Sequence, residues 1–231
     1  MASIAENLQL VRQRIARGCH DARRPAQSVT LLAVSKTFGA TQVHEAFAAG
    51  QRDFGENYVQ EALAKMTALA ELRDALRWHL IGPLQSNKTR VVAEQFDWVH
   101  SVERLKTAQR LAEQRPAGLP PLQLCLQVNI SGEASKSGLM PDEVAAVAQA
   151  VAALPTERVR LRGLMSIPEP ADDIDAQRLP HRRLRELLHA LNASGLTMDT
   201  LSMGMSADLD AAVAEGATIV RVGSAIFGAR G

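Results

Sequence analysis

Two kinds of hydrophobic pattern take turns along this chain. Short runs of consecutive apolar and β-branched residues are typical of strands that are buried on both faces, as in a parallel sheet. Runs of this kind predict eight strands, at 29–34, 53–54, 77–81, 98–100, 122–130, 159–165, 200–203 and 218–222. The fifth run is the longest, so we expect it to form the longest strand.

Between these runs the apolar residues recur at a spacing of three or four, which predicts amphipathic helices. The first helix precedes the first strand, because Ser3 and Glu6 form a capping-box pattern and the apolar stripe that follows ends near Gly18. Pro141 is expected in the first turn of a later helix, and Ser206 at the N-cap of the last long one. Including these two, the helices predicted after the first strand cover 41–49, 59–69, 86–95, 105–115, 141–154, 184–194 and 206–215. A short helical turn follows the last strand.

Eight strands that alternate with helices in 231 residues predict an α/β fold, a single (β/α)8 TIM-barrel domain over 1–231 with one extra helix at its amino end. An open, doubly wound parallel sheet is the alternative that periodicity leaves open. No glycine-rich dinucleotide fingerprint follows any predicted strand, which favours the barrel.

Composition narrows the class of protein. An apolar fraction of 46% and a charged fraction of 22% are ordinary for a globular protein, and a net charge of +1 argues against a nucleic-acid partner. No apolar run is long enough to span a bilayer. The two cysteines, Cys19 and Cys125, have no disulfide, redox or metal-ligand spacing, so we expect a reducing compartment, the cytoplasm. We expect a small-molecule ligand, no metal, and a monomer.

The lysine at position 36 stands where the first apolar run ends. The sequence LLAVSK has no turn residue before the lysine, so the strand would carry the ammonium group of Lys36 to its carboxyl end. In a TIM barrel that end forms the active face, and a desolvated amine there can act as a nucleophile or Schiff-base partner. A solvated lysine at a strand end is the ordinary alternative.

Arg221 lies inside the last apolar run, where an unpaired guanidinium would be costly to bury. Two explanations stay open: a structural ion pair with a carboxylate, or a donor aimed at a ligand on the active face. His79 also lies in an apolar run, and we expect it to be a core histidine with satisfied hydrogen bonds rather than a proton donor.

Small residues follow the last two strands. In TIM barrels the loops after strands seven and eight frequently bind phosphate, because backbone N–H groups at the start of a short helix attract an anion. Gly223 and Ser224 follow the eighth strand, and the segment Ser202-Met203-Gly204 supplies a similar loop from the seventh. An amine, an arginine and a phosphate cradle on one face suit a phosphorylated aldehyde, for which pyridoxal 5'-phosphate (PLP) is the candidate.

Seven blocks of the chain together resemble the pyridoxal phosphate homeostasis protein family. They cover nearly the whole chain in the right order: LLAVSKT, FGENYVQEA, WHLIGPLQSNK, QVNISGEASKSG, LRGLMSIP, LSMGMSADLDAA and VRVGSAIFGAR. Members of the family resemble the barrel domain of fold type III enzymes such as alanine racemase. The resemblance therefore implies a PLP-binding protein that acts in PLP homeostasis, by buffering or delivering the cofactor, and not an enzyme.

The resemblance also implies a role for each candidate residue. Lys36 would hold PLP as an internal aldimine, and Arg221 would face the pyridine nitrogen, where a permanent cation makes the ring a poorer electron sink. Asn57 and Met203 would line the ring. The residues expected around the phosphate are Ser202, Gly204, Gly223 and Ser224. Ser224 stands where threonine is common in the family, and the segment 168–181 is less recognisable.

Two other functions use the same amine. A racemase of the alanine racemase type needs a second acid/base, and the only tyrosine here is Tyr58. The chain ends about ten residues after the last strand, so we also expect no β-rich second domain. A lysine-dependent aldolase would not explain the phosphate cradle. A carrier is therefore the expectation, with apo PLP-dependent enzymes as possible acceptors, and Lys88 and Lys136 stay open as second cofactor-handling lysines or solvated charges.

Overall fold

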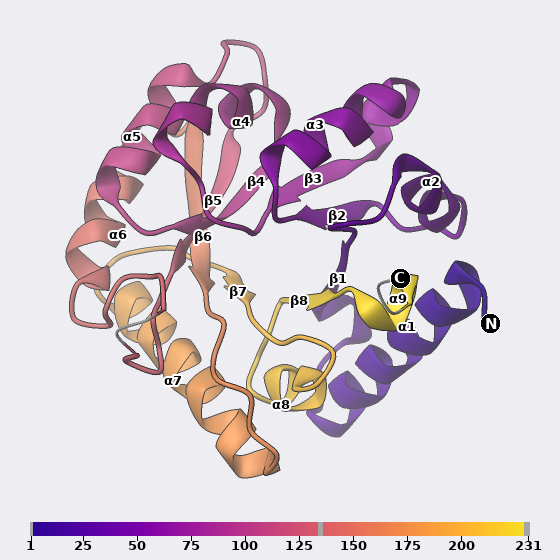
Figure 1. The fold of residues 1–231 in the computed structure, drawn as a ribbon. Helices are drawn as coiled ribbons and strands as arrows, with labels where there is room; N and C mark the ends of the chain where they lie inside the picture. The colour runs from indigo at the N-terminus through magenta and orange to yellow at the C-terminus, as the bar shows by residue number, and fades with distance from the viewer. Residues whose placement is uncertain (1, 134–135, 229–231) are drawn as a thin grey trace.

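Eight parallel strands close into a barrel in the computed structural model, which describes residues 2–133 and 136–228. The strands follow one another around the barrel in sequence order, as Figure 1 shows. The TIM-barrel prediction is confirmed, and the open-sheet alternative is wrong. The strands are β1 (Thr30–Val34), β2 (Asp53–Glu56), β3 (Arg77–Leu80), β4 (Trp98–Val102), β5 (Leu122–Gln127), β6 (Val159–Met165), β7 (Thr200–Ser202) and β8 (Ile219–Val222).

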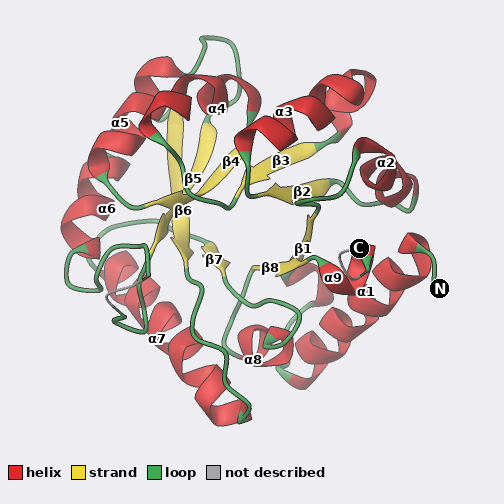
Figure 2. Cartoon of the chain, viewed as in Figure 1, coloured by secondary structure: helices red, strands yellow, loops and turns green. Residues whose placement is uncertain are grey.

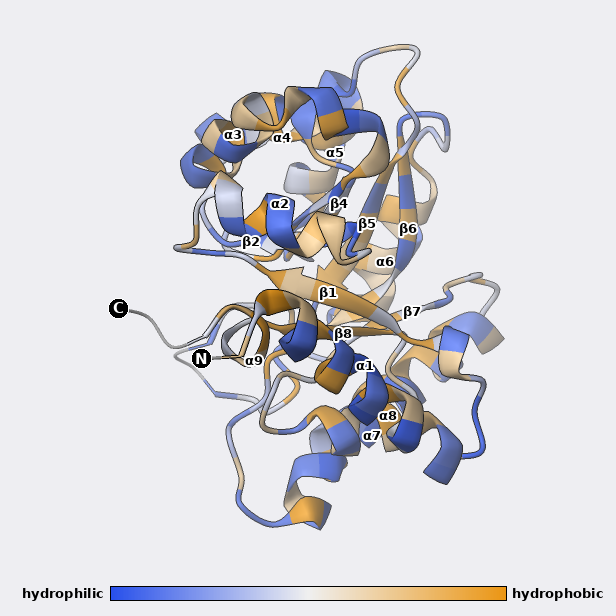
Figure 3. Ribbon diagram, turned by 90° about the vertical axis from the view of Figure 1, so that its right-hand side faces the viewer, coloured by the Kyte–Doolittle hydropathy of each residue, from blue (hydrophilic) through white to orange (hydrophobic). Residues whose placement is uncertain are grey.

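The helices form a layer around the strands (Figure 2). Each helix has a buried apolar side, and Figure 3 shows the mixed hydrophilic and hydrophobic colour of the helices beside the largely hydrophobic β1. The α-helices are α1 (Ile4–Asp21), α2 (Ala40–Ala48), α3 (Val59–Ala68), α4 (Thr89–Gln95), α5 (Leu105–Gln114), α6 (Val144–Ala152), α7 (Ile174–Ala193), α8 (Leu209–Ala214) and α9 (Ser224–Phe227). None of the described helices is long and apolar enough to cross a membrane.

The extra helix α1 covers the seam where the barrel closes. Its N-terminus has the predicted capping box: Ser3 Oγ accepts from the Glu6 N–H at 3.2 Å, and the Glu6 carboxylate accepts from the Ser3 N–H at 2.7 Å. The buried side of the helix packs against α2, α8 and α9, which flank the first and last strands. Local capping thus starts a helix whose tertiary role is to join the two ends of the barrel.

Closure brings the first and last strands side by side. In the β1–β8 register Leu32 lies opposite Arg221, and Ala33 lies opposite Val222. Two positions along the chain that are almost its whole length apart therefore become neighbours. The strand that ends before Lys36 and the strand that carries Arg221 share one edge of the active face.

Three predicted boundaries are wrong. The longest strand is β6 with seven residues, because β5 has six and leaves the sheet after Gln127. Helix α6 begins at Val144 rather than at Pro141, since the Glu143 carboxylate accepts from the Met140 N–H at 2.8 Å and closes a turn first. Ser206 is not the N-cap of α8, which begins at Leu209; its carbonyl instead accepts from Arg14 Nη1 at 2.7 Å.

Two further differences concern helix starts. The predicted helix from Ser86 begins with a 3-10 turn, Ser86–Lys88, and becomes α-helical at Thr89. Helix α7 begins at Ile174, inside the segment 168–181, where Asp173 accepts from the Ala176 N–H at 2.9 Å.

Part of the QVNISGEASKSG block, residues 134–135, and the end of the VRVGSAIFGAR block, residues 229–230, lie outside the described residues.

Candidate functional site

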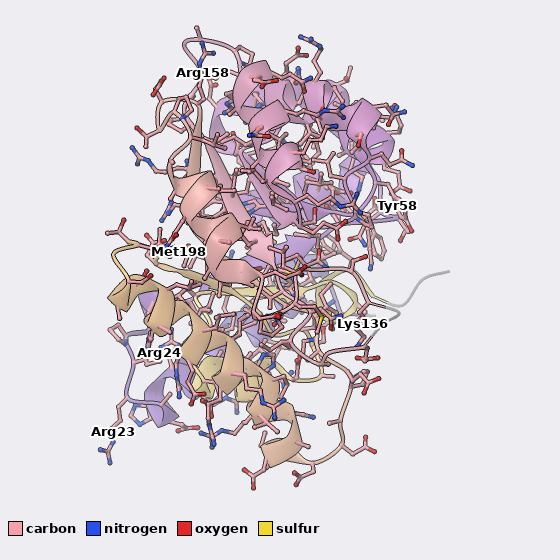
Figure 4. The ribbon with its side chains drawn as sticks, turned by 90° about the vertical axis from the view of Figure 1, so that its left-hand side faces the viewer. Arg23, Arg24, Tyr58, Lys136, Arg158 and Met198 are labelled. Carbon is pink, nitrogen blue, oxygen red and sulfur yellow. The ribbon has the colours of Figure 1, made fainter. Side chains whose placement is uncertain are left out.

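The carboxyl ends of the strands form one end of the barrel, and the candidate residues gather there. Figure 4 shows the two ends: Tyr58 and Lys136, which follow β2 and β5, lie on one side of the molecule, whereas Arg158 and Met198, which precede β6 and β7, lie on the other. Parallel strands all end at the same side of their sheet, so the loops after them share this face.

Lys36 follows β1 after a single residue, Ser35, and is half-buried. No described residue makes a hydrogen bond or ion pair with its ammonium group. The residue before it is held firmly: Ser35 Oγ donates to Glu56 Oε1 at 2.5 Å, and Lys65 Nζ donates to the Ser35 carbonyl at 2.6 Å. The backbone just before Lys36 is therefore fixed, while the amine has no partner among residues 2–133 and 136–228.

Glu56 and Lys65 form a buried ion pair beneath this turn, with 2.6 Å between Glu56 Oε1 and Lys65 Nζ. Burial raises the pKa of Glu56 above its ordinary value, although Lys65 and Ser35 oppose the shift. Sequence reasoning missed Lys65. A signal was present, because Lys65 belongs to the buried side of α3 with Ala62 and Met66, where an apolar residue is the rule.

Arg221 is 4% exposed, and carbonyl and hydroxyl oxygens accept its hydrogen bonds. Nη1 donates to the Ser202 carbonyl at 2.6 Å and to Ser202 Oγ at 2.8 Å, and Nη2 donates to the Ser166 carbonyl at 2.8 Å. No carboxylate within the described part of the chain bonds to it, so the structural ion pair is wrong. Burial lowers the pKa of Arg221 to about 10, which still leaves it a cation at neutral pH. Its Nε–H and second Nη2–H have no described partner.

The loop after β7 is packed closely against β8. Ser202 and Met203 are fully buried, and Gly204 is buried as well. Gly204 has a φ of +90°, and a Cβ there would lie 2.4 Å from the Ala212 Cβ, so only glycine fits. The Gly204 carbonyl accepts from the Arg221 N–H at 3.0 Å. The predicted loop residues and Arg221 are thus brought together.

Gly223 and Ser224 lie where β8 passes into α9. The N–H groups of Ile226 and Phe227 donate to the Gly223 carbonyl at 2.8 and 3.0 Å. The N–H groups of Ser224 and Ala225 begin the helix and have no acceptor within it. A Cβ on Gly223 would lie 3.2 Å from the Val34 carbonyl oxygen, which places this turn beside the end of β1. Open backbone donors and the end of the lysine strand are therefore adjacent.

Asn57 follows β2 and is half-buried. It is not a helix cap, because α3 has Tyr58 at its N-cap and no side chain caps it. Its Oδ1 is buried without a hydrogen-bond partner among the residues described, and the same holds for Ser166 Oγ after β6. Buried polar atoms are normally paired, so two unpaired atoms on this face indicate room for a ligand's polar groups.

A cavity of about 640 Å³ opens beside Asn57, on the same face. It lies between the loops that follow β3, β4 and β5, and its polar lining includes Ser101 and Asn129. Lys136 also lines it and pairs with Glu133, with 2.5 Å between Nζ and Oε1. Lys88 lies at the end of the 3-10 turn before α4 and is half-buried. Lys36 and Arg221 line no part of this cavity.

Three other sequence predictions concern the cysteines, metal ligands and a core histidine. Cys19 and Cys125 are buried free cysteines, and burial raises the pKa of Cys125 to about 12. Among residues 2–133 and 136–228, no three His, Cys, Asp or Glu side chains gather as metal ligands would. His79 is buried and hydrogen-bonded, as expected of a core histidine.

Comparisons with known proteins agree along the whole chain. The family model described as "Alanine racemase, N-terminal domain" matches residues 1–231. A pyridoxal phosphate homeostasis protein of Pseudomonas aeruginosa is 62% identical over 230 residues, covering 100% of this chain and 97% of the relative. The protein of the same name from Escherichia coli is 51% identical over 231 residues, covering 100% of this chain and 98% of the relative.

Solved structures show the same fold. PipY of Synechococcus elongatus, in a structure described as having PLP bound, superposes with a TM-score of 0.85 at 39% identity, covering 98% of this chain and 100% of PipY. Alanine racemase of Corynebacterium glutamicum superposes with a TM-score of 0.72 at 18% identity, covering 98% of this chain but 61% of the racemase. At that identity the racemase shows a shared barrel and no more.

Proposed function

Because this chain belongs to the pyridoxal phosphate homeostasis protein family, we propose that it binds PLP at the carboxyl face of its barrel and buffers or delivers the cofactor. The family's name and the PLP in the PipY structure support the ligand. The chemistry of the face supports the same ligand independently.

The residues present fit the parts of PLP. Lys36, whose side-chain nitrogen has no partner among the described residues, would hold PLP as an internal aldimine. The open N–H groups of Ser224 and Ala225, with Gly223, Gly204 and the Ser202 loop, suit the phosphate. Asn57 and Met203 would contact the ring. When bound, PLP supplies an electrophilic carbon and an electron-accepting ring, and the protein supplies the anchor and the charges.

The observation that carries the proposal is Arg221, a buried cation without a carboxylate partner among the described residues. A charge in that position is costly unless something compensates it, and an anionic, aromatic ligand would do so. Two of its N–H donors remain for such a ligand, beside the strand that leads to Lys36. A guanidinium that stays protonated at neutral pH would keep a ring nitrogen unprotonated, so the bound ring would be poorly suited to stabilising a carbanion.

This makes a carrier the better proposal than an amino-acid racemase. Racemisation needs an acid/base on each side of the bound substrate. Tyr58, the only tyrosine, is 56% exposed, and no described residue hydrogen-bonds to its hydroxyl. The likeness to the alanine racemase of Corynebacterium glutamicum, at 18% identity, is one of fold. We further propose that the protein is a cytoplasmic monomer and that its acceptors are apo forms of PLP-dependent enzymes.

Reduction with borohydride tests the anchor. We expect purified protein incubated with PLP to show visible absorption, and borohydride to fix the cofactor onto Lys36 in a peptide found by mass spectrometry. Lys36→Ala should lose both signals, because no other amine occupies that position. Lys106→Ala, which removes an exposed lysine of α5, is the matched control and should keep them. A colourless wild type would overturn the proposal.

The same loaded protein separates a carrier from an enzyme. Mixed with apo forms of PLP-dependent enzymes, it should restore their activity faster than the release of PLP into solution allows. It should not interconvert the enantiomers of alanine or serine. Fast turnover of either amino acid would reverse the choice between the two functions.

A further inference from the structure

A row of buried polar side chains crosses the interior of the barrel from its amino end to Arg221. Asp53 Oδ1 lies 3.2 Å from His79 Nε2, and His79 Nδ1 lies 3.0 Å from His100 Nε2. His100 Nδ1 lies 2.8 Å from Ser202 Oγ, which accepts from Arg221 Nη1 at 2.8 Å. Five side chains from β2, β3, β4, β7 and β8 therefore form one continuous hydrogen-bonded row.

Every member of the row is nearly inaccessible to water. Exposed fractions are 7% for Asp53, 4% for Arg221 and at most 1% for His79, His100 and Ser202. The His79 ring is stacked on the Trp98 ring, with centroids 5.4 Å apart and planes 7° from parallel, which fixes its orientation. A row held in one arrangement at low dielectric has strong, mutually polarising hydrogen bonds.

With both histidine rings neutral, the two end groups fix the direction of every hydrogen bond. An ionised carboxylate can only accept and a guanidinium can only donate. Burial, helped by the charge of Arg221, lowers the pKa of His100 well below its ordinary value, so the ring is neutral. His79 Nε2–H then donates to Asp53, His100 Nε2–H donates to His79, the Ser202 hydroxyl donates to His100, and Arg221 donates to Ser202. A protonated His79 would reverse two of these bonds and leave the Ser202 proton without an acceptor in the described chain.

The far end of the row is anchored at the amino side of the barrel. Burial by itself would raise the pKa of Asp53, but hydrogen bonds from Arg77 and His79 together lower it to about 2. Arg77 donates to both Asp53 oxygens, at 2.6 and 2.8 Å, and its side chain is 58% exposed. Asp53 therefore stays ionised, and the row has a fixed negative end opposite the cation of Arg221.

We propose that Asp53, His79 and His100 are positioning residues that hold the Ser202 hydroxyl as an acceptor for Arg221 and so orient the guanidinium toward the ligand face. Apolar side chains would fill the barrel interior at lower cost, since each of these polar groups must be desolvated and paired. The row has a direction, and it ends on the one buried cation to which the proposed function gives a role. The inference rests on the proposed function only for what Arg221 faces.

The protonation pattern can be measured without any cofactor. Long-range ¹H–¹⁵N correlation spectra of the apo-protein should show His79 and His100 both as the Nε2–H tautomer. Asp53→Asn keeps an oxygen that accepts from His79 but removes the charge. We expect this change to move the nitrogen shifts of His100, which Asp53 does not touch. Asp199→Asn is the matched control, because Asp199 pairs with Arg162 and has no histidine neighbour in the row.

Ligand binding gives a second measurement. Asp53→Asn should weaken PLP binding about fivefold, and Asp199→Asn should leave it unchanged. His100→Asn keeps an acceptor for Ser202 but cannot reach His79, so Asp53→Asn should add no further loss in that background. An Nδ1–H tautomer at either histidine in the wild type would overturn the proposed role of the row. Full additivity of Asp53→Asn and His100→Asn would overturn it as well. Absence of PLP binding with the expected tautomers would instead overturn the proposed function and leave the row standing.

Discussion

The hydrogen-bond partners of Arg221 could not be predicted from the sequence. Its position in an apolar strand predicted burial and a defined partner, and the partners prove to be two carbonyls and a hydroxyl. A buried cation held only by neutral acceptors keeps most of its field available to a ligand. Lys36 is the complementary case, because Ser35, the residue before it, is held by Glu56 and Lys65 while the Lys36 amine has no described partner.

The substitution Arg221→Glu tests the role of this cation. Replacing the cation with a carboxylate should still allow borohydride to fix PLP onto Lys36, because the anchor is untouched, but should shift the absorption of the bound cofactor and weaken binding at least about tenfold. Arg221→Lys keeps the charge and should lie between this variant and the wild type. Absorbance titration measures both quantities. An unchanged spectrum and affinity in Arg221→Glu would show that Arg221 does not face the ring.

Among the elements, β1, β2 and α3 form the support of the lysine. The buried pair of Glu56 and Lys65 links the end of β2 to the side of α3, and Lys65 also holds the Ser35 carbonyl. A buried ion pair adds little net stability, yet the removal of one partner leaves an uncompensated charge. The pair therefore fixes the turn before Lys36 at a definite position.

Lys65→Met tests this support. We expect the free energy of unfolding to fall by about 3 kcal/mol, because Glu56 loses its counter-ion and must bind a proton to stay buried. Above the raised pKa of Glu56 the loss should be largest, and it should shrink as the pH falls and Glu56 is protonated. Urea unfolding at several pH values measures this. Lys106→Met, at an exposed position, should change stability by less than about 0.5 kcal/mol, and an equal effect of both variants would contradict the role of the pair.

The whole molecule depends on closure, which leaves no free strand edge and brings β8 beside β1. Closure requires very close backbone contact between β6 and β7. A Cβ on Gly163 would lie 1.8 Å from the Thr200 carbonyl oxygen, so no side chain fits between these strands. One glycine thus permits the approach that places the β7 loop and Arg221 on the same face.

Gly163→Ala should therefore destabilise the barrel by more than about 3 kcal/mol, as overpacking against backbone cannot be relieved by a rotamer change. Gly118→Ala is the control, since Gly118 has a φ of +92° but nothing within 4 Å of a Cβ, and should cost only about 1 kcal/mol. Thermal unfolding followed by circular dichroism gives both values. A small loss at Gly163 would mean that β6 and β7 can separate without cost to the fold.

Local sequence patterns predicted the alternation of strands and helices, the barrel class, the capping of α1 and the candidates Lys36, Arg221 and Gly223-Ser224. These follow from local periods, caps and the rule that the loops at one end of a barrel hold the site. The start of α6 and the end of β5 were predicted wrongly. A side-chain hydrogen bond determines where α6 begins, and pairing with a neighbouring strand determines where β5 ends.

The contacts between distant residues follow from the three-dimensional fold and not from local patterns. The partners of Arg221, the row from Asp53 to Ser202 and the pair of Glu56 and Lys65 join elements that are far apart along the chain. No local pattern encodes such contacts, because they depend on strand register and on which side chains face the barrel interior. The physical reason is closure. Hydrophobic burial favours the closed barrel, and the strand register of the barrel then determines which polar side chains become neighbours.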